Sequence, residues 1–413
     1  MISIIIPTFN RSKILEKTLS RLKIQTYDKK NYEIIVVDDG SSEDIASIVE
    51  NCKLPVEHNV IRLCKRSHNG GKPRNAGANI ARGDILLFQD CDRLFFKDTL
   101  ERHRESVPDN MSISLGFNLE PKQYKDDWPL DISQIDLSQF QMDYREAVFG
   151  NYCLKEEFPF VYCNTNHVAL SRSLFDSVGG FDESFNKWGF EDNELGYRLW
   201  KNGINFIFNK QAVAIHHPHL QHTFTRDPYM KMGVQFLRIH PVFEVEASVF
   251  IDDFDDVCED YNEYIRLGRE LALKLDRCRP ANFKPIPIIP DILLGASEMP
   301  GQKAGIRISL CEEDNPDMRL LGIRLPYDDQ AVKTLLVSAF WRFLPLQVLN
   351  QVFSEIFRVS SRILIQSYDS TDRLPHLKAY WKGDVNELRL IGSDYFDFNP
   401  MPDCKNIFEM IRI

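Results

Sequence analysis

Two aspartates separated by one residue follow a strongly apolar run. Residues 85–88 read as a buried strand, and Asp90 and Asp92 come directly after it. At the end of a strand, two such carboxylates can share one site, where one meets a hydroxyl or a water and the other a divalent cation such as Mg²⁺ or Mn²⁺. A bound cation of this kind stabilises negative charge on a departing phosphate. The Asp-Cys-Asp tripeptide alone would also fit a surface loop. Its position directly after an apolar strand favours a binding site.

A second acidic pair stands where a helix is expected to begin. The run WGFED ends at Glu191 and Asp192 and leads into a helical pattern that Gly203 can terminate. The dipole at a helix N-terminus stabilises anions, which favours an ionised base at neutral pH. A weakly nucleophilic hydroxyl needs a base of this kind within hydrogen-bond reach. The competing interpretation is that both carboxylates merely complement the start of the helix.

Cationic and imidazole side chains complete the candidate set. Lys72 and Arg74 lie in the segment GGKPRNAG, where glycines permit close backbone approach and the cations suit a phosphate. A solvated basic loop is the alternative. An apolar run at 213–215 is followed by His216, His217 and His219, whose imidazoles could bind a metal, with a structural role as the alternative.

Alternating strand and helix patterns explain how distant residues could meet. The strands expected in the first half are 3–6, 32–37, 60–63, 85–88 and 213–215, with helices at 14–22, 75–81 and 173–178. Such alternation predicts a mostly parallel sheet, in which ligands bind beyond the carboxyl ends of the strands. Asp38, Asp39 and the Asp90/Asp92 pair all follow strands, so we expect them to converge on one crevice. The polar, aromatic stretch 120–160 reads as irregular structure over that crevice.

Composition limits the class of protein. With 413 residues, two or three domains are expected, and a formal charge of −10 argues against nucleic-acid or anionic-membrane partners. No run approaches the roughly 18 apolar residues of a membrane span, and the start MISIIIPTFNR lacks the pattern of a secretion signal. Nine cysteines without CxxC spacing indicate reduced thiols. Together these features predict a cytoplasmic protein without a transmembrane segment.

Four segments in register resemble one known family. ISIIIPTFNR, YEIIVVDDGSS, GGKPRNAGANIARGDILLFQDCD and WGFEDNELGYRL look like those of family 2 glycosyltransferases with a GT-A fold. The last segment is also similar to the galactosyltransferase-type motif of bacterial chondroitin and hyaluronan synthases. The resemblance covers about residues 1–222. It implies transfer of a sugar from a nucleotide-sugar, with a UDP-sugar expected, to the hydroxyl of a carbohydrate or glycoconjugate acceptor in polysaccharide biosynthesis.

The resemblance assigns the donor site residue by residue. It places Pro7 and Thr8 against the nucleoside, with Asp39 accepting from the edge of the base. Lys72 and Arg74 would approach the diphosphate.

It also assigns the ribose and the metal. Asp90 would touch the ribose, while Asp92 and His216 would bind Mn²⁺ or Mg²⁺, with His217 or His219 as the alternative ligand.

The WGFED segment contains the residues that the resemblance assigns to the acceptor. The resemblance makes Asp192 the catalytic base, Glu191 a holder of an acceptor hydroxyl and Trp188 a surface on which a sugar ring stacks. Direct displacement by a hydroxyl that Asp192 activates would invert the anomeric centre. Phe190 departs from the usual Gly or Trp at its position, which puts the size of the acceptor ring in question.

The rest of the chain predicts a separate α/β domain. A helical, acidic pattern at 242–275 and the prolines after it divide the chain into a transferase domain at 1–240, a helical linker at 241–284 and a smaller domain at 285–413. Residues 323–367 resemble the middle of a class I methyltransferase, but 288–309 contain no GxGxG turn for S-adenosylmethionine. We therefore expect an accessory domain that kept the fold and lost the cofactor site.

Two other functions fit part of the pattern. A nucleotidyltransferase would also use paired aspartates and a cation, but it would not need the WGFED segment. A non-catalytic nucleotide- or carbohydrate-binding scaffold would not need Asp92, Asp192 and His216 together. A metal-dependent inverting glycosyltransferase is therefore the leading prediction.

Overall fold

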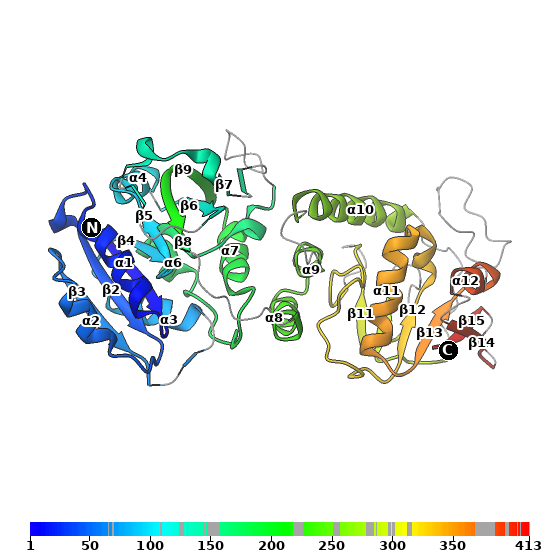
Figure 1. The fold of residues 1–413 in the computed structure, drawn as a ribbon. Helices are drawn as coiled ribbons and strands as arrows, with labels where there is room; N and C mark the ends of the chain where they lie inside the picture. The colour runs from blue at the N-terminus through cyan, green and yellow to red at the C-terminus, as the bar shows by residue number, and fades with distance from the viewer. Residues whose placement is uncertain are drawn as a thin grey trace. The chain divides into compact units, whose positions relative to one another are not determined.

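The chain forms two compact units, Met1–Met232 and Gly233–Ile413, in the computed structural model (Figure 1). The structure describes residues 1–64, 66–67, 70–107, 110–123, 128–129, 131–143, 145–146, 157–217, 226–250, 257–277, 285, 287–295, 299, 302–311, 316–367, 385–392, 396–402, 404 and 406–412. Within these ranges no helix is long and apolar enough to cross a membrane.

The first unit is built on one mixed sheet whose strands run in the order β3-β2-β1-β4-β8-β6-β9-β5, with β7 beside β6. The strands are β1 (Ile2–Thr8), β2 (Tyr32–Asp38), β3 (His58–Arg62), β4 (Ile85–Gln89), β5 (Arg93–Phe95), β6 (Ser112–Pro121), β7 (Phe140–Gln141), β8 (His167–Ser171) and β9 (Asn205–His216). Strands β1 to β4 pair in parallel, whereas β8 is antiparallel to both β4 and β6. The sheet is therefore mixed, and the α/β class expected of this domain is confirmed.

Helices join and flank these strands. They are α1 (Ser12–Lys23), α2 (Ile45–Asn51), α3 (Gly71–Ile80), α4 (Thr99–Ser106), α6 (Arg172–Ser177) and α7 (Glu191–Lys201). Helix α8 (Arg226–Ile239) begins in the first unit and ends in the second. Strands β1, β2 and β4 are almost continuously apolar because both faces of a parallel sheet are covered. Leu15, Leu19 and Leu22 lie on one face of α1 and join Ile4 of β1 in the core. Burial of that stripe fixes the loop before α1 at the carboxyl end of β1.

Strand β6 was not expected from the sequence. It runs through the centre of the sheet and enters the stretch 120–160 that was read as irregular. Its residues alternate strictly between polar and apolar from Ser112 to Leu119, which is a strand signal. The polar face of β6 is nevertheless buried, because its side chains have hydrogen-bond partners. For example, Nδ1 of His103 lies 2.9 Å from Oγ of Ser114. The expectation of a mostly parallel sheet therefore holds for β1 to β4 and for the β6–β9 pair, whereas the pairs of β8 with β4 and β6 and of β5 with β9 are antiparallel.

The second unit carries its own sheet, in the order β11-β10-β12-β13-β15-β14. Its elements are α9 (Phe243–Phe250), α10 (Val257–Arg277), β10 (Ile292–Leu294), β11 (Ile306–Ile308), β12 (Leu335–Val337), α11 (Leu346–Val359), β13 (Ile363–Gln366), α12 (Val385–Gly392), β14 (Phe396–Pro400) and β15 (Ile407–Arg412). The first four strands of this order are parallel, and β15 is antiparallel to both of its neighbours. A smaller α/β domain was expected here, and its class is confirmed.

Candidate active site

Arg74 brings together three carboxylates from two distant segments. Its Nη2 donates to Oδ1 of Asp90 at 2.7 Å, while Nη1 lies 3.8 Å from Oδ1 of Asp192 and 3.9 Å from Oε1 of Glu191. Arg74 is only 4% exposed. Burial alone would lower the pKa of the guanidinium, but Asp90, Asp192 and Glu191 raise it, so the side chain stays cationic. The predicted donor and acceptor residues therefore share one cluster.

The glycine before α3 allows Arg74 to take this position. A Cβ atom at Gly70 would lie 2.0 Å from Nη1 of Arg74, so a side chain there would displace the guanidinium. Lys72 lies on the first turn of the same helix and is exposed. Lys72 and Arg74, which are neighbours in the sequence, therefore differ in their surroundings. Arg74 is buried against three carboxylates, whereas Lys72 is exposed to solvent.

Glu191 and Asp192 begin α7 after a tight turn. Gly189 has φ 116° and Phe190 has φ 63°, a left-handed conformation that costs energy for a bulky residue. Asp192 accepts a hydrogen bond from the Thr165 hydroxyl, and Oε2 of Glu191 accepts from the backbone N–H of Gly189 at 3.2 Å. The turn and these bonds fix both carboxylates beside the end of β4.

Burial opposes the effect of the helix dipole on these two carboxylates. It is the largest cause that raises the pKa of Glu191 to about 7, with the neighbouring Asp192 adding to it and Arg74 opposing it. Burial likewise raises the pKa of Asp192, against the lowering effect of Arg74. The side chain of Asp192 is 22% exposed and that of Glu191 only 7%, so Asp192 is the more accessible of the two carboxylates.

Asp92 and His216 lie together at the edge of the sheet. Strand β5 pairs antiparallel with β9, which sets Arg93 opposite His216 and brings Asp92 within reach. Nε2 of His216 lies 3.9 Å from Oδ2 of Asp92, and its Nδ1 lies 2.6 Å from Oε2 of Glu120. A histidine whose far nitrogen is held by a carboxylate is the usual arrangement of a metal ligand.

The other two histidines differ from His216. Nε2 of His217 lies 3.2 Å from Nζ of Lys17 and therefore accepts from an ammonium, while its backbone N–H donates to the carbonyl of Asp92. That nitrogen is thus engaged by a cation. His219 lies outside the described residues.

The spacing of Asp92 and His216 suits a divalent cation. A separation of 3.9 Å is too long for a hydrogen bond but shorter than about 4.2 Å, twice a typical metal–ligand distance. Among the described residues no group of three or more His, Cys, Asp or Glu side chains could hold a metal. A cation bound here would need further oxygen ligands, which is usual for Mg²⁺-type sites that substrate phosphates complete.

The residues expected to contact the nucleoside lie at the ends of β1 and β2. Thr8 is opposite Asp38 in the parallel pairing, and its carbonyl accepts from the N–H of Asp39 at 2.9 Å. The carboxylate of Asp39 accepts from the backbone N–H and the hydroxyl of Ser67, at 2.9 and 2.8 Å. Asp38 accepts from the backbone N–H of Ser41 and so supports the turn after β2. Pro7, within β1, is partly exposed.

Several site residues were missed in the sequence. Arg11, to which no role in the chemistry was assigned, donates from Nη1 to Oδ2 of Asp92 at 2.9 Å. Glu120 is the penultimate residue of β6, and the alternation of that strand could have revealed its position. Tyr229 of α8 lies with its ring centroid 4.6 Å from Phe190 and 5.4 Å from Trp188. No sequence signal marks Tyr229, since only the fold brings α8 to the WGFED turn.

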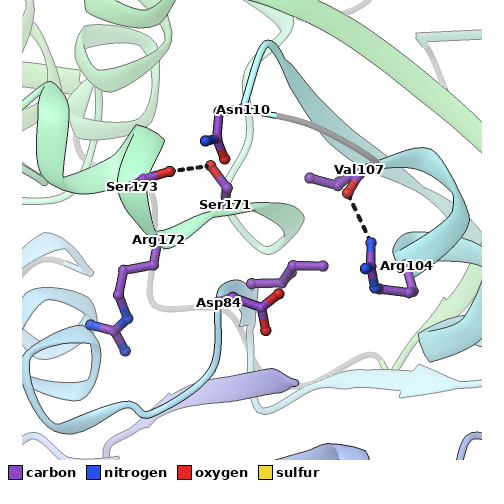
Figure 2. A pocket seen from close by; sticks show the side chains of 8 residues that line it. Asp84, Arg104, Val107, Asn110, Ser171, Arg172 and Ser173 are labelled. Atoms are coloured by element: carbon purple, nitrogen blue, oxygen red, sulfur yellow. Dashed lines mark hydrogen bonds between the residues drawn. The ribbon is translucent and has the colours of Figure 1, made fainter.

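A separate cavity lies at the opposite end of the sheet. It has a volume of about 350 Å³ and is lined by Asp84 and Ile85, at the start of β4, and by residues from α4 and the end of β8 (Figure 2). Arg104 and Arg172, its two cationic residues, donate to backbone carbonyls, including those of Val107 and Gly83. The cavity is therefore distinct from the carboxylate cluster at the other end of β4.

Comparison with known proteins identifies the class of enzyme. Residues 3–179 match the family described as glycosyl transferase family 2, and residues 154–223 match the N-terminal domain of galactosyltransferase. The chain is a glycosyltransferase. This identification favours a glycosyltransferase over a nucleotidyltransferase or a non-catalytic scaffold.

Individual relatives cover different parts of the chain. Validoxylamine A glucosyltransferase of Streptomyces hygroscopicus subsp. limoneus is 24% identical over 409 residues, covering 88% of this chain and 90% of that protein. Chondroitin synthase of Pasteurella multocida (strain Pm70) is 33% identical over 242 residues, covering 52% of this chain and 24% of that protein. The structure of S. aureus TarS 1-349 in complex with UDP-GlcNAc has 18% identity and a TM-score of 0.45, covering 64% of this chain and 71% of that one.

Proposed function

We propose that the chain transfers a hexose from a UDP-sugar to a hydroxyl of a carbohydrate acceptor, with a divalent cation and with inversion at the anomeric carbon. The contact of Arg74 with Asp90 and with the Glu191–Asp192 pair carries this proposal. It joins the end of β4, where a donor would bind, to the start of α7, where an acceptor would be activated. One site can therefore hold both substrates.

On the donor side, the chain offers groups of suitable chemistry. The backbone and side chains at Thr8, Asp39 and Ser67 surround the place where a nucleoside would bind. Asp90 would accept from a ribose hydroxyl, and Arg74 holds that carboxylate in place. Lys72, exposed on the first turn of the same helix, would approach the diphosphate.

Asp92 and His216 would hold Mn²⁺ or Mg²⁺. Such a cation supplies electrostatic stabilisation of the negative charge that builds on the departing diphosphate. Glu120 would keep His216 in the tautomer whose Nε2 is unprotonated, because Nδ1 donates its proton to that carboxylate. The chemistry of this pair, one carboxylate and one imidazole, suits a hard or borderline cation.

On the acceptor side, Asp192 would act as the base. The acceptor oxygen forms a bond to the anomeric carbon, its proton passes to Asp192, and the bond from that carbon to the diphosphate oxygen breaks with both electrons leaving on the diphosphate. One displacement of this kind inverts the anomeric centre. Glu191 would hold a second acceptor hydroxyl, and Trp188, 58% exposed, presents a ring on which a sugar can stack. The names of the two relatives, a glucosyltransferase and a chondroitin synthase, support sugar chemistry on both substrates.

The test is a donor screen with purified full-length protein. UDP-, GDP- and dTDP-sugars are supplied with Mn²⁺, and nucleotide release and the thermal shift of the protein are measured. We expect a UDP-sugar to give both signals and Asp92→Ala to abolish the release. Release that persists in Asp92→Ala, or that needs no divalent cation, would contradict the metal-dependent mechanism.

We also propose that the second unit is an accessory domain that binds no S-adenosylmethionine. A methyltransferase-like domain would use the space beyond the carboxyl end of its first parallel strand. A Cβ atom at Gly295, directly after β10, would lie 2.3 Å from Ser338 Oγ and 2.4 Å from the Phe340 ring. These side chains pack where a cofactor would approach. Equilibrium dialysis of the full chain with S-adenosylmethionine is expected to detect no binding.

A further inference from the structure

One oxygen of Asp92 faces both Arg11 and His216. Oδ2 of this carboxylate accepts from Nη1 of Arg11 at 2.9 Å, and the same Oδ2 faces Nε2 of His216 at 3.9 Å. We propose that Arg11 is an internal counter-cation, which holds Asp92 before a divalent cation binds and withdraws when the cation takes that oxygen. This inference rests on the proposed metal site formed by Asp92 and His216.

The physical need for a counter-cation follows from burial. The side chain of Asp92 is only 6% exposed, and a buried carboxylate without a partner is costly. Nε of Arg93 lies 3.7 Å from the other oxygen of Asp92, Oδ1. Arg11 is therefore the cation beside Oδ2, the oxygen that faces His216. A guanidinium and a divalent cation at one oxygen repel each other, so the second must displace the first.

The backbone around Arg11 allows this movement. Arg11 is the residue before α1, and its side chain is 30% exposed, so it can turn outward into solvent. Its carbonyl still accepts from Leu15 N–H at 2.9 Å, which keeps the helix start in place whatever the side chain does. After withdrawal the guanidinium remains at the carboxyl end of β1, beside the proposed diphosphate site. Metal and nucleotide should therefore favour each other's binding, since the phosphates offer Arg11 a new partner.

Mn²⁺ titrations of the full-length protein, followed by electron paramagnetic resonance without nucleotide, test the competition. Arg11→Gln removes the counter-cation and is expected to bind Mn²⁺ about tenfold more tightly than the parent protein. Arg82→Gln is the matched control, because Arg82 also pairs with a buried carboxylate, Glu33, at the amino end of β2. Its Mn²⁺ affinity should equal that of the parent. Equal affinities in Arg11→Gln and the parent would overturn the proposal.

Asp92→Asn separates failure of this inference from failure of the metal site. If Asp92→Asn binds Mn²⁺ as the parent does, the proposed site itself is wrong. If it loses Mn²⁺ while Arg11→Gln is unchanged, only the role of Arg11 is wrong. Should Arg11→Gln not fold, the parent protein gives the answer: phenylglyoxal modification of Arg11, mapped by mass spectrometry, should accelerate several-fold when Mn²⁺ saturates the site. An unchanged rate would contradict withdrawal.

Discussion

Nη1 of Arg74 lies 3.8 Å from Oδ1 of Asp192, although α3 and α7 are far apart in the sequence. The same guanidinium donates to Asp90, so a single buried cation ties the proposed donor site to the proposed base. An arginine suits this position because its planar group can face several carboxylates at once, whereas a lysine presents a single point charge.

Replacing Arg74 should therefore change the pH profile as well as the rate. Arg74 lowers the pKa of Asp192 and of Glu191, whose pKa is about 7, against the effect of burial. A base acts only when deprotonated, so activity falls as the pH drops through its pKa. Arg74→Met should raise both pKa values and move the acid limb of the kcat/KM profile to higher pH. Arg74→Lys, which keeps the charge, should show a smaller movement, and identical acid limbs in all three proteins would refute this account.

Asp192→Asn should separate transfer from donor binding. The amide keeps the shape and the contact with Thr165 but cannot accept a proton, so transfer should fall by about 10²-fold or more. UDP-sugar affinity, measured by calorimetry, should stay within about twofold. Glu191→Gln is the matched control and should cost mainly acceptor affinity. Transfer at the parent rate by Asp192→Asn would show that another group is the base.

Glu120→Gln tests how His216 is oriented. The amide can present its NH₂ group to Nδ1 of His216 and so favour the wrong tautomer, and it cannot supply the charge of the carboxylate 2.6 Å away. Loss of such an outer partner typically lowers metal affinity by about 10- to 100-fold. Mn²⁺ affinity is the measurement, and Glu105→Gln, on the surface of α4, is the control. An unchanged affinity would mean that Glu120 does not orient a ligand.

Much of this site could be predicted from the sequence, for a definite reason. Asp39, Asp90 and Asp92 follow apolar strands, and the carboxyl ends of parallel strands meet at one edge, so their convergence follows from pattern alone. The sequence pattern does not predict which other side chains contact these carboxylates and the WGFED turn. Arg11 and Tyr229 reach the site through side-chain directions that depend on tertiary packing. The pairing of β5 with β9, which selects His216, is likewise a long-range contact.

Tyr229 is expected to hold the turn that carries Trp188. Its ring packs at a tilt against both Trp188 and Phe190, and a Cβ atom at Gly189 would lie 2.4 Å from it. Tyr229→Ala should raise the acceptor KM by about tenfold, since the stacking ring loses support worth roughly 1 kcal/mol or more. Tyr229→Phe keeps the ring and should behave as the parent does. Donor hydrolysis should be unaffected in both; an unchanged acceptor KM in Tyr229→Ala would exclude this role.

A buried histidine pair should make the first unit sensitive to acid. His103 and His167 are both 0% exposed, with their Nε2 atoms 2.8 Å apart, so one nitrogen donates and the other accepts. Burial lowers the pKa of His103 to about 3 and holds that of His167 well below 6.5, where His103, Arg145 and Arg93 add to the effect. In the unfolded chain both imidazoles take up protons near pH 6.5.

The stability that this pair contributes is therefore present above about pH 6.5 and is lost as the pH falls towards 3, at up to about 1.4 kcal/mol per pH unit for each imidazole. Hydrogen exchange of peptides from β6 and β8, corrected for intrinsic rates at pH 7.5 and 5.0, measures this loss. In His103→Gln, with one titrating group removed, protection should be lower at pH 7.5 but should fall less between the two pH values. His58→Gln, at a partly exposed histidine of β3, should match the parent at both. If His103→Gln lost protection as steeply as the parent, the pair would not be the source of the acid sensitivity.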